Sequence, residues 1–186
     1  MNKTVKTLLT VLGLALLIGA AVYFYNTLSA DYEPEAPLAS EGGQESESEK
    51  AADFTVYNAG GEAFTLSSFE GRPVVINFWA TWCGYCVAEM PDFDEVYSEY
   101  GDRVEFMMVN ATDEASGETV EAASAYIEEN GYGFPVYYDL DGEAVSAYSV
   151  RGLPTTYIIN SEGGIHAYSV GAISGDALRY ALEGLA

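Results

Sequence analysis

Residues 79–86 of this 186-residue chain have the sequence WATWCGYC and contain both of its cysteines, Cys83 and Cys86. The preceding residues 73–78 form an apolar run, which predicts a buried β-strand. Beyond the second cysteine, apolar side chains recur at helical spacing as far as Tyr100 and a glycine follows, which predicts a helix. The cysteine pair is therefore expected where a buried strand passes into the N-terminus of a helix.

The predicted position of Cys83 favours a reactive thiolate. At a helix N-terminus, unpaired backbone N–H groups and the helix dipole stabilise negative charge. An ordinary cysteine has a pKa of about 8.5 and is only about three per cent ionised at neutral pH, whereas a pKa of about 7 makes half of it nucleophilic. One helical turn brings Cys86 back to Cys83, so the two sulfurs are expected to form and reopen a disulfide.

Two other uses of a cysteine pair fit these residues less well. A zinc site needs about four ligands, and the single histidine, His166, lies far along the chain. A purely structural disulfide gains little from closing so short a loop, because the entropic benefit grows with loop length. The cysteine count and spacing therefore favour redox chemistry, in which Cys83 attacks a substrate disulfide and Cys86 resolves the mixed disulfide.

The chain resembles the thioredoxin superfamily over residues 52–186. The resemblance is carried by residues 77–86, by Pro91 five residues after the second cysteine, and by the Gly-Leu-Pro-Thr-Thr sequence at residues 152–156. Within the superfamily the chain is most similar to membrane-anchored, extracytoplasmic thiol-disulfide oxidoreductases of the TlpA and ResA type. This resemblance implies a thioredoxin-like α/β fold, with a central mixed sheet flanked by helices, an N-terminal β-hairpin and an α/β insertion.

Two polar residues near the cysteines bear on proton transfer. Asn77 stands where cytoplasmic thioredoxins have a buried aspartate, and an amide cannot exchange a proton near neutral pH. Glu89 follows Cys86 by three residues, so helical geometry can direct it toward the pair. It also matches a glutamate of ResA-like proteins, and the resemblance implies a role in the acid–base chemistry of the cysteines. The alternative is a solvated glutamate on the helix surface.

The resemblance also implies a substrate groove beside the cysteines. Most X-Pro peptide bonds are trans, but the resemblance assigns a cis bond to Leu153-Pro154. A cis Pro154 would place the Leu153 backbone beside Cys83, where its amide and carbonyl groups can pair with an extended substrate peptide. The resemblance makes Trp79 a wall of the site together with Trp82, with core packing as the alternative. The remaining groove residues are expected to be Trp82, Gly84 and Tyr85.

The N-terminal 28 residues predict a transmembrane anchor. They contain no acidic residue, and Lys3 and Lys6 precede an apolar run of 18 residues at positions 8–25, which is long enough to cross a bilayer with its flanks. The lysines are expected to stay cytoplasmic. The protein would then be a single-pass protein of the cell membrane, with its catalytic domain on the extracytoplasmic side. The alternative is a cleaved signal peptide, which also places the enzyme outside the cytoplasm.

An acidic segment follows at residues 29–51. It is rich in Ser, Glu and Gly, and such a composition cannot bury enough apolar surface to offset the entropy of ordering, which predicts a disordered linker. All 29 acidic residues lie beyond residue 28, against five basic ones, so this part of the chain has a net charge of −24. Nucleic acid is an implausible partner for such a chain, because phosphate binding requires the opposite sign.

The remaining sequence predicts alternating strands and helices up to the C-terminus. A β-hairpin is expected from residues 54–57 and 63–66, around an Asn-Ala-Gly-Gly turn. The strand at residues 104–110 is expected to run parallel to the first strand, because a helix separates them. Further elements are expected at residues 118–129 (helix), 134–138 (strand), 143–148 (short helix), 165–170 (last strand of a hairpin) and after Ser174 (closing helix).

The resemblance further implies a direction and partners for the reaction. The expected activity is reduction of disulfides in secreted proteins or in apocytochrome c. Electrons would come from a membrane thiol donor of the CcdA or DsbD type, and no cofactor beyond the cysteine pair is implied. A disulfide-forming oxidase and a non-catalytic binding module that uses the same groove remain alternatives. A peroxidase is disfavoured, because its reactive cysteine normally lies in a different sequence context.

Overall fold

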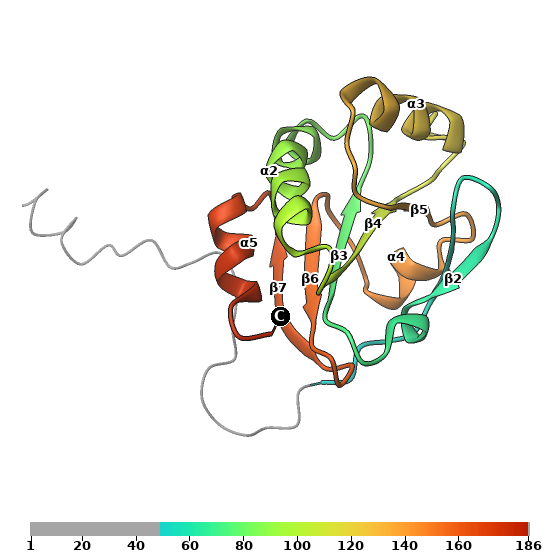
Figure 1. The fold of residues 1–186 in the computed structure, drawn as a ribbon. Helices are drawn as coiled ribbons and strands as arrows, with labels where there is room; N and C mark the ends of the chain where they lie inside the picture. Colours follow the sequence, from blue (N-terminus) through green and yellow to red (C-terminus); the bar gives the residue numbers. More distant parts are fainter. Residues whose placement is uncertain (1–48, 186) are drawn as a thin grey trace, which may run out of the picture. The chain divides into compact units, whose positions relative to one another are not determined.

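In the computed structural model, which describes residues 49–185, seven strands form one mixed sheet (Figure 1). The strands are β1 (Thr55–Tyr57), β2 (Ala63–Thr65), β3 (Val74–Trp79), β4 (Glu105–Asn110), β5 (Val136–Tyr138), β6 (Thr155–Ile159) and β7 (Ile165–Val170). Their order across the sheet is β2-β1-β5-β4-β3-β6-β7. The mixed sheet and its antiparallel β1–β2 hairpin confirm the predicted fold class.

Strand β3 lies inside the sheet, between one parallel and one antiparallel neighbour. It pairs in parallel with β4, as predicted, and the helix α2 (Gly84–Tyr100) connects the two strands. It pairs antiparallel with β6, and in this register Phe78 lies opposite Thr155. Phe78 leads into the cysteine motif and Thr155 directly follows Pro154. The register therefore brings both motifs to the same end of the sheet.

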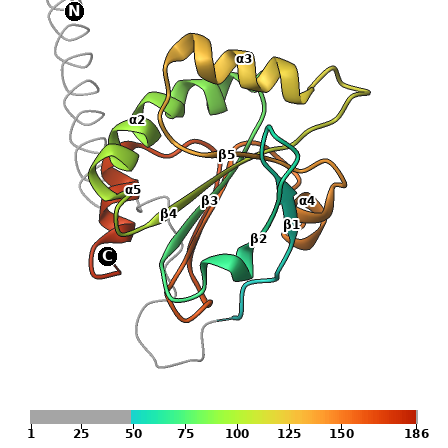
Figure 2. The same cartoon turned by 45° about the vertical axis from the view of Figure 1, so that its right-hand side comes forward.

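Helices cover both faces of the sheet. Besides α2 they are η1 (Leu66–Phe69, a 3₁₀ turn), α3 (Val120–Asn130), α4 (Glu143–Ala147) and α5 (Gly175–Leu182). Because successive strand residues face opposite sides, Val75 and Trp79 of β3 join the core formed with α2, α3 and α5, while Ile76 and Phe78 join the core formed with α4. Figure 2 shows α2 and α5 on one side of the sheet and α4 on the other.

Polar side chains cap the N-termini of α3 and α5. The hydroxyl of Ser174 accepts a hydrogen bond from the N–H of Ala177, which confirms it as the cap of the closing helix. Thr119 caps α3 in the same way, so this helix begins at residue 120 and the predicted start at Glu118 is wrong. Glu118 instead lies in the preceding loop, where its backbone forms an antiparallel bridge with Asp113.

Residues 49–51 are attached to the sheet next to the start of β7. The carbonyl of Glu49 accepts a 2.8 Å hydrogen bond from the N–H of Ile165, and the N–H of Ala51 donates a 2.9 Å bond to the carbonyl of Gly163. These three residues of the predicted linker thus belong to the fold. The rest of the linker and the predicted anchor, residues 1–28, lie outside the described residues. Within residues 49–185, no helix combines the length and apolar character needed to cross a membrane.

Candidate active site

Cys83 and Cys86 are joined by a disulfide at the N-terminus of α2. Their Cα atoms are 5.3 Å apart, within the usual range for a disulfide. The predicted bond between the two sulfurs is therefore confirmed. Cys83 is the N-cap residue of the helix and keeps 7% of its surface exposed, whereas Cys86 is fully buried. An incoming thiol or disulfide can therefore reach Cys83 more directly than Cys86.

The start of α2 offers the sulfur of Cys83 a hydrogen-bond donor. The N–H of Cys86 donates to Sγ of Cys83 at 3.2 Å, and the carbonyl of Cys83 accepts a 3.0 Å bond from the N–H of Val87. Gly84, the first residue of the helix, is exposed. After reduction, the same N–H group and the positive end of the helix dipole favour negative charge on the sulfur of Cys83. The arrangement fits the predicted role of Cys83 as the nucleophile.

The carboxyl group of Glu89 is buried one helical turn after Cys86. Its Oε1 accepts a 2.8 Å hydrogen bond from Nδ2 of Asn77, and its Oε2 accepts a 2.9 Å bond from the N–H of Ile173. Burial raises the pKa of Glu89 to about 7, and the charge of Asp92 also raises it. The two hydrogen bonds lower the pKa but do not offset burial. The side chain is only 3% exposed, so the alternative of a solvated surface glutamate is wrong.

The side chain of Asn77 joins Glu89 to β6. Its Nδ2 donates to Oε1 of Glu89 and, at 3.0 Å, to Oγ1 of Thr156. Its Oδ1 is buried and has no hydrogen-bond partner within the described part of the chain. The amide therefore presents only donors to Glu89, which suits the ionised carboxylate. A protonated Glu89 needs an acceptor instead, and rotation of the amide by half a turn would supply Oδ1.

The Leu153-Pro154 peptide bond is cis, as the resemblance implies. Pro154 is buried, and its carbonyl accepts a 2.8 Å hydrogen bond from the N–H of Gly171, which follows the last residue of β7. Leu153 is half-buried and contacts both hydrophobic cores. This loop lies at the end of the sheet that also carries Cys83. The backbone pairing of Leu153 with a substrate stays a prediction.

Two exposed aromatic side chains accompany the accessible cysteine. Trp82 is 61% exposed and Tyr85 is 74% exposed. Trp79, in contrast, is fully buried, and its ring centre lies 6.2 Å from that of Tyr126. Trp79 is therefore a core residue, and the expectation that it forms a wall of the site is wrong. Large apolar side chains at the surface next to a reactive sulfur suit contact with a protein substrate.

Two polar residues of the site have no clear signal in the sequence. Thr156 accepts the second hydrogen bond of the Asn77 amide. Glu118 is fully buried and accepts hydrogen bonds from Thr81, two residues before Cys83. For Glu118, the one local indication is the threonine that follows it. A threonine often caps a helix, and the residue before such a cap lies outside the helix.

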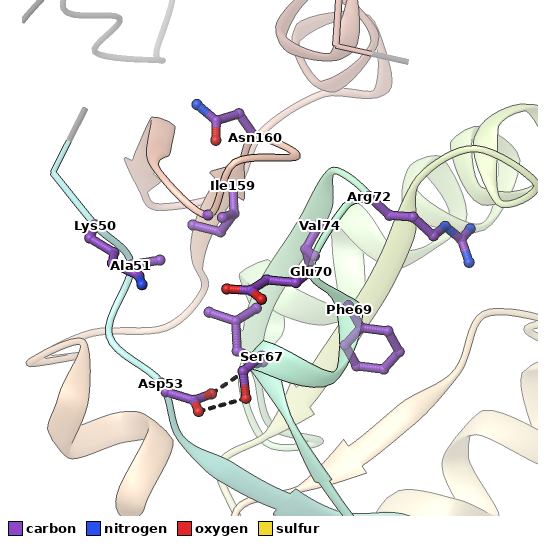
Figure 3. A pocket seen from close by; sticks show the side chains of 12 residues that line it. Lys50, Ala51, Asp53, Ser67, Phe69, Glu70, Arg72, Val74, Ile159 and Asn160 are labelled. Atoms are coloured by element: carbon purple, nitrogen blue, oxygen red, sulfur yellow. Dashed lines mark hydrogen bonds between the residues drawn. The ribbon is translucent and has the colours of Figure 1, made fainter. Parts of the chain in front are cut away.

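A separate cavity of about 130 Å³ lies at the opposite end of β3 from the cysteines (Figure 3). Its wall includes Val74, the first residue of β3, and Ile159, the last residue of β6. In this wall the carboxylate of Asp53 accepts hydrogen bonds from the N–H of Ser67 at 2.9 Å and from its hydroxyl at 2.7 Å (Figure 3). None of the lining residues belongs to the cysteine site.

Known thiol-disulfide oxidoreductases are similar to this chain. The chain matches the AhpC/TSA family model over residues 48–168. The thiol-disulfide oxidoreductase ResA of Halalkalibacterium halodurans is 34% identical over 127 residues, which are 68% of this chain and 69% of that protein. The thiol-disulfide oxidoreductase ResA of Geobacillus thermodenitrificans is 29% identical over 186 residues, which are 100% of this chain and 99% of that protein.

A solved structure shares the fold. The crystal structure of StoA from Bacillus subtilis matches with a TM-score of 0.61 and 26% sequence identity, covering 70% of this chain and 96% of StoA. The family match spans more than half of the chain, and the residues that carry the predicted chemistry, Cys83 and Cys86, fall within it. The chain therefore belongs to the AhpC/TSA family, as a thiol-disulfide oxidoreductase related to ResA.

Proposed function

We propose that this protein reduces disulfides of other proteins outside the cytoplasm. The observation that carries the proposal is the disulfide at the start of α2, in which Cys83 is accessible and Cys86 is buried. In such a pair, the accessible sulfur can attack a substrate and the buried sulfur can attack only its neighbour. This division suits a dithiol that exchanges disulfides with a substrate and resolves its own mixed disulfide.

The proposed reaction transfers two electrons from the dithiol to a substrate disulfide. The Cys83 thiolate attacks one substrate sulfur, the substrate S–S bond breaks, and the other substrate sulfur leaves as a thiolate that takes up a proton. Cys86 then loses its proton and attacks Sγ of Cys83. The mixed disulfide breaks, the second substrate thiol is released, and Cys83 and Cys86 end as the enzyme disulfide.

Glu89 is proposed to accept the proton that Cys86 releases. It lies one helical turn further along α2 on the buried side of the helix, and its pKa of about 7 allows it to bind and release a proton near neutral pH. Asn77 supports this role, because its amide can serve the ionised carboxylate as a donor and, after rotation, the protonated form as an acceptor.

The proposed substrates are secreted proteins or apocytochrome c. Support comes from the exposed rings of Trp82 and Tyr85, which offer an apolar contact surface beside Cys83. The loop of Leu153 and Pro154 lies at the same end of the sheet, and it is proposed to pair with an extended segment of the substrate. A folded or flexible protein, rather than a small disulfide, can use both surfaces at once.

The proposed location is the outer side of the cell membrane, where residues 1–28 anchor the protein. The two lysines that precede the apolar run of residues 8–25 support this orientation. Re-reduction by a membrane thiol donor of the CcdA or DsbD type would close the cycle. In intact cells, a reduced Cys83 is expected to react with a membrane-impermeant maleimide, and the full-length chain is expected to remain with washed membranes. A protein released by a salt wash would contradict the anchor.

The reduction potential tests the direction of the reaction. Equilibration of the purified protein with dithiothreitol or glutathione buffers is expected to give a reduction potential of about −270 mV. This value is the reducing end of the range for thioredoxin folds. A potential near about −120 mV would contradict the proposal and indicate a disulfide-forming oxidase. If a Cys83→Ser variant restored the cellular function of a deletion strain, the protein would be a binding module instead.

A further inference from the structure

Glu118 is a buried carboxylate next to the active-site loop that the proposed reaction does not use. It lies between β4 and α3, and its side chain has no exposed surface. Its Oε1 accepts hydrogen bonds from the N–H of Thr81 at 2.9 Å and from Nδ2 of Asn110 at 2.6 Å. Its Oε2 accepts a 2.6 Å bond from the hydroxyl of Thr81. Both donors of Thr81 therefore point at one carboxylate.

A buried carboxylate of this kind is costly unless its surroundings compensate it. Among the ion pairs of the described residues, none involves Glu118. Its compensation comes from three neutral donors, two of them on Thr81. Removing the carboxylate alone would leave these three donors without their acceptor, which is costly where they are buried, so Glu118 serves to hold Thr81 and Asn110. The groups that the carboxylate holds in place indicate its role.

The carboxylate holds the turn that leads into the nucleophile. Thr81 lies two residues before Cys83, and within this turn the N–H of Cys83 donates a 3.1 Å hydrogen bond to the carbonyl of Ala80. Trp82, between Thr81 and Cys83, is 61% exposed, so the protein surface gives it little lateral support. The hydrogen bonds between Glu118 and Thr81 therefore fix the backbone next to Trp82, and with it the orientation of the Trp82 ring.

Both backbone hydrogen-bonding groups of Glu118 are also paired. Its N–H donates to the carbonyl of Asp113 at 3.1 Å, and its carbonyl accepts from the N–H of Asp113 at 3.0 Å. Asn110, the third partner, is the last residue of β4 and is fully buried, and its Oδ1 accepts a 3.0 Å bond from the hydroxyl of Thr112. The carboxylate thus connects the sheet to the active-site turn through short, satisfied contacts.

We propose that Glu118 is a positioning residue for thiol–disulfide exchange with protein substrates. By fixing both donors of Thr81, it holds Trp82 and Cys83 in one orientation, including in the reduced state, in which the covalent link to Cys86 is absent. The inference rests on the proposed function and adds a specificity element to it. Small disulfides need only the sulfur of Cys83, whereas a protein disulfide must also fit the surface that Trp82 forms.

Single-turnover oxidation of the reduced protein tests this inference, with insulin as the protein disulfide and oxidised glutathione as the small one. Glu118→Ala is expected to slow the reaction with insulin by about tenfold, because misplacement of reacting groups is expensive in rate. The reaction with oxidised glutathione is expected to change far less. Glu118→Gln should recover most of the insulin rate, because its amide can serve the same three partners. Glu121→Ala, an exposed position on α3, is the matched control.

A second pair of variants keeps the test decisive if Glu118→Ala does not fold. Thr81→Val removes the hydroxyl donor and keeps the N–H, and it is expected to show the same selective loss with insulin. Thr81→Ser keeps both donors and should behave like the wild type. In amide NMR spectra, the Thr81 N–H signal is expected to move in Glu118→Gln while the signals of α5 stay unchanged.

Two outcomes would overturn the inference. One is an equal loss of rate toward insulin and oxidised glutathione in Thr81→Val, which would indicate a general effect on the fold or on Cys83. The other is an insulin rate in Thr81→Val that equals the rate of the wild type and of Thr81→Ser. A wild-type protein that does not react with insulin would instead count against the proposed function, so the two failures can be told apart.

Discussion

Nδ2 of Asn77 donates a 2.8 Å hydrogen bond to Oε1 of Glu89, so a buried amide of β3 faces a buried carboxyl group of α2. The contact lies one helical turn beyond Cys86 and reaches β6 through Thr156. It joins the central strand, the active-site helix and the strand that follows the cis proline. A change in the protonation of Glu89 is therefore expected to alter the hydrogen bonds that join all three elements.

Replacement of Glu89 by Gln is expected to remove a pH dependence from folding stability. The pKa of Glu89 is about 7 in the folded protein, and its ordinary value is 4.5. Between these values the folded state holds a proton that the unfolded state has released, so the stability contributed by Glu89 decreases as pH rises through this window. A shift of this size corresponds to about 3 kcal/mol in the free energy of unfolding, which is lost by about pH 8.

Urea unfolding of both proteins between about pH 5 and pH 8 measures this effect. The free energy of unfolding of Glu89→Gln, relative to the wild type, is expected to rise by up to about 3 kcal/mol as pH increases. Glu121→Gln, on the exposed surface of α3, is the control and should give a flat difference. Stability curves of Glu89→Gln and the wild type that stay parallel would mean that Glu89 does not titrate in this range.

Replacement of Asn77 by Asp is expected to couple two carboxyl groups. The new carboxyl group would stand in hydrogen-bond contact with Glu89, and like charges at this distance cannot both ionise without a large penalty. One proton is then expected to be shared, so that one pKa of the pair rises above the value of about 7 for Glu89. Carbon NMR of the labelled carboxyl groups checks this result. If both groups ionised below about pH 6, the site would be more polar than its burial indicates.

Truncation of the exposed rings is expected to affect function more than folding. Trp82→Ala and Tyr85→Ala should each change the free energy of unfolding by less than about 0.5 kcal/mol, as is usual for exposed positions. The KM for a protein disulfide is expected to rise several-fold in each variant. Tyr180→Ala, which removes another exposed ring on α5, is the control. Equal KM values in all three variants would remove Trp82 and Tyr85 from the proposed contact surface.

Local sequence signals were sufficient for the parts of the site that lie close together in the chain. The spacing of Cys83 and Cys86, with a strand before and a helix after them, predicts the observed disulfide because the whole arrangement spans one helical turn. The cap at Ser174 and the parallel pairing of β3 with β4 follow from equally local patterns. The disulfide and the cap depend on residues three positions apart, and the strand pairing depends on the single helix that connects the two strands.

Other features depend on partners that the sequence does not bring together. The hydrogen bond between Glu89 and Ile173 spans 84 positions of the chain, and the bond between Glu118 and Thr81 spans 37 positions. The burial of Trp79 depends on the packing of α3 against the end of β3. The cis bond before Pro154 opposes the usual preference of X-Pro bonds, and the resemblance to a known family was its only source.

The most direct test of the central claim is a covalent trap of the reaction intermediate. Reduced Cys86→Ser is mixed with a protein disulfide, quenched, and analysed by mass spectrometry without reductant. A mixed disulfide that joins Cys83 to the substrate is expected to accumulate, because the resolving sulfur is absent, and the same variant expressed in the native cell would identify its substrates. Absence of an adduct, or an equally abundant adduct through Cys86 in Cys83→Ser, would contradict the account.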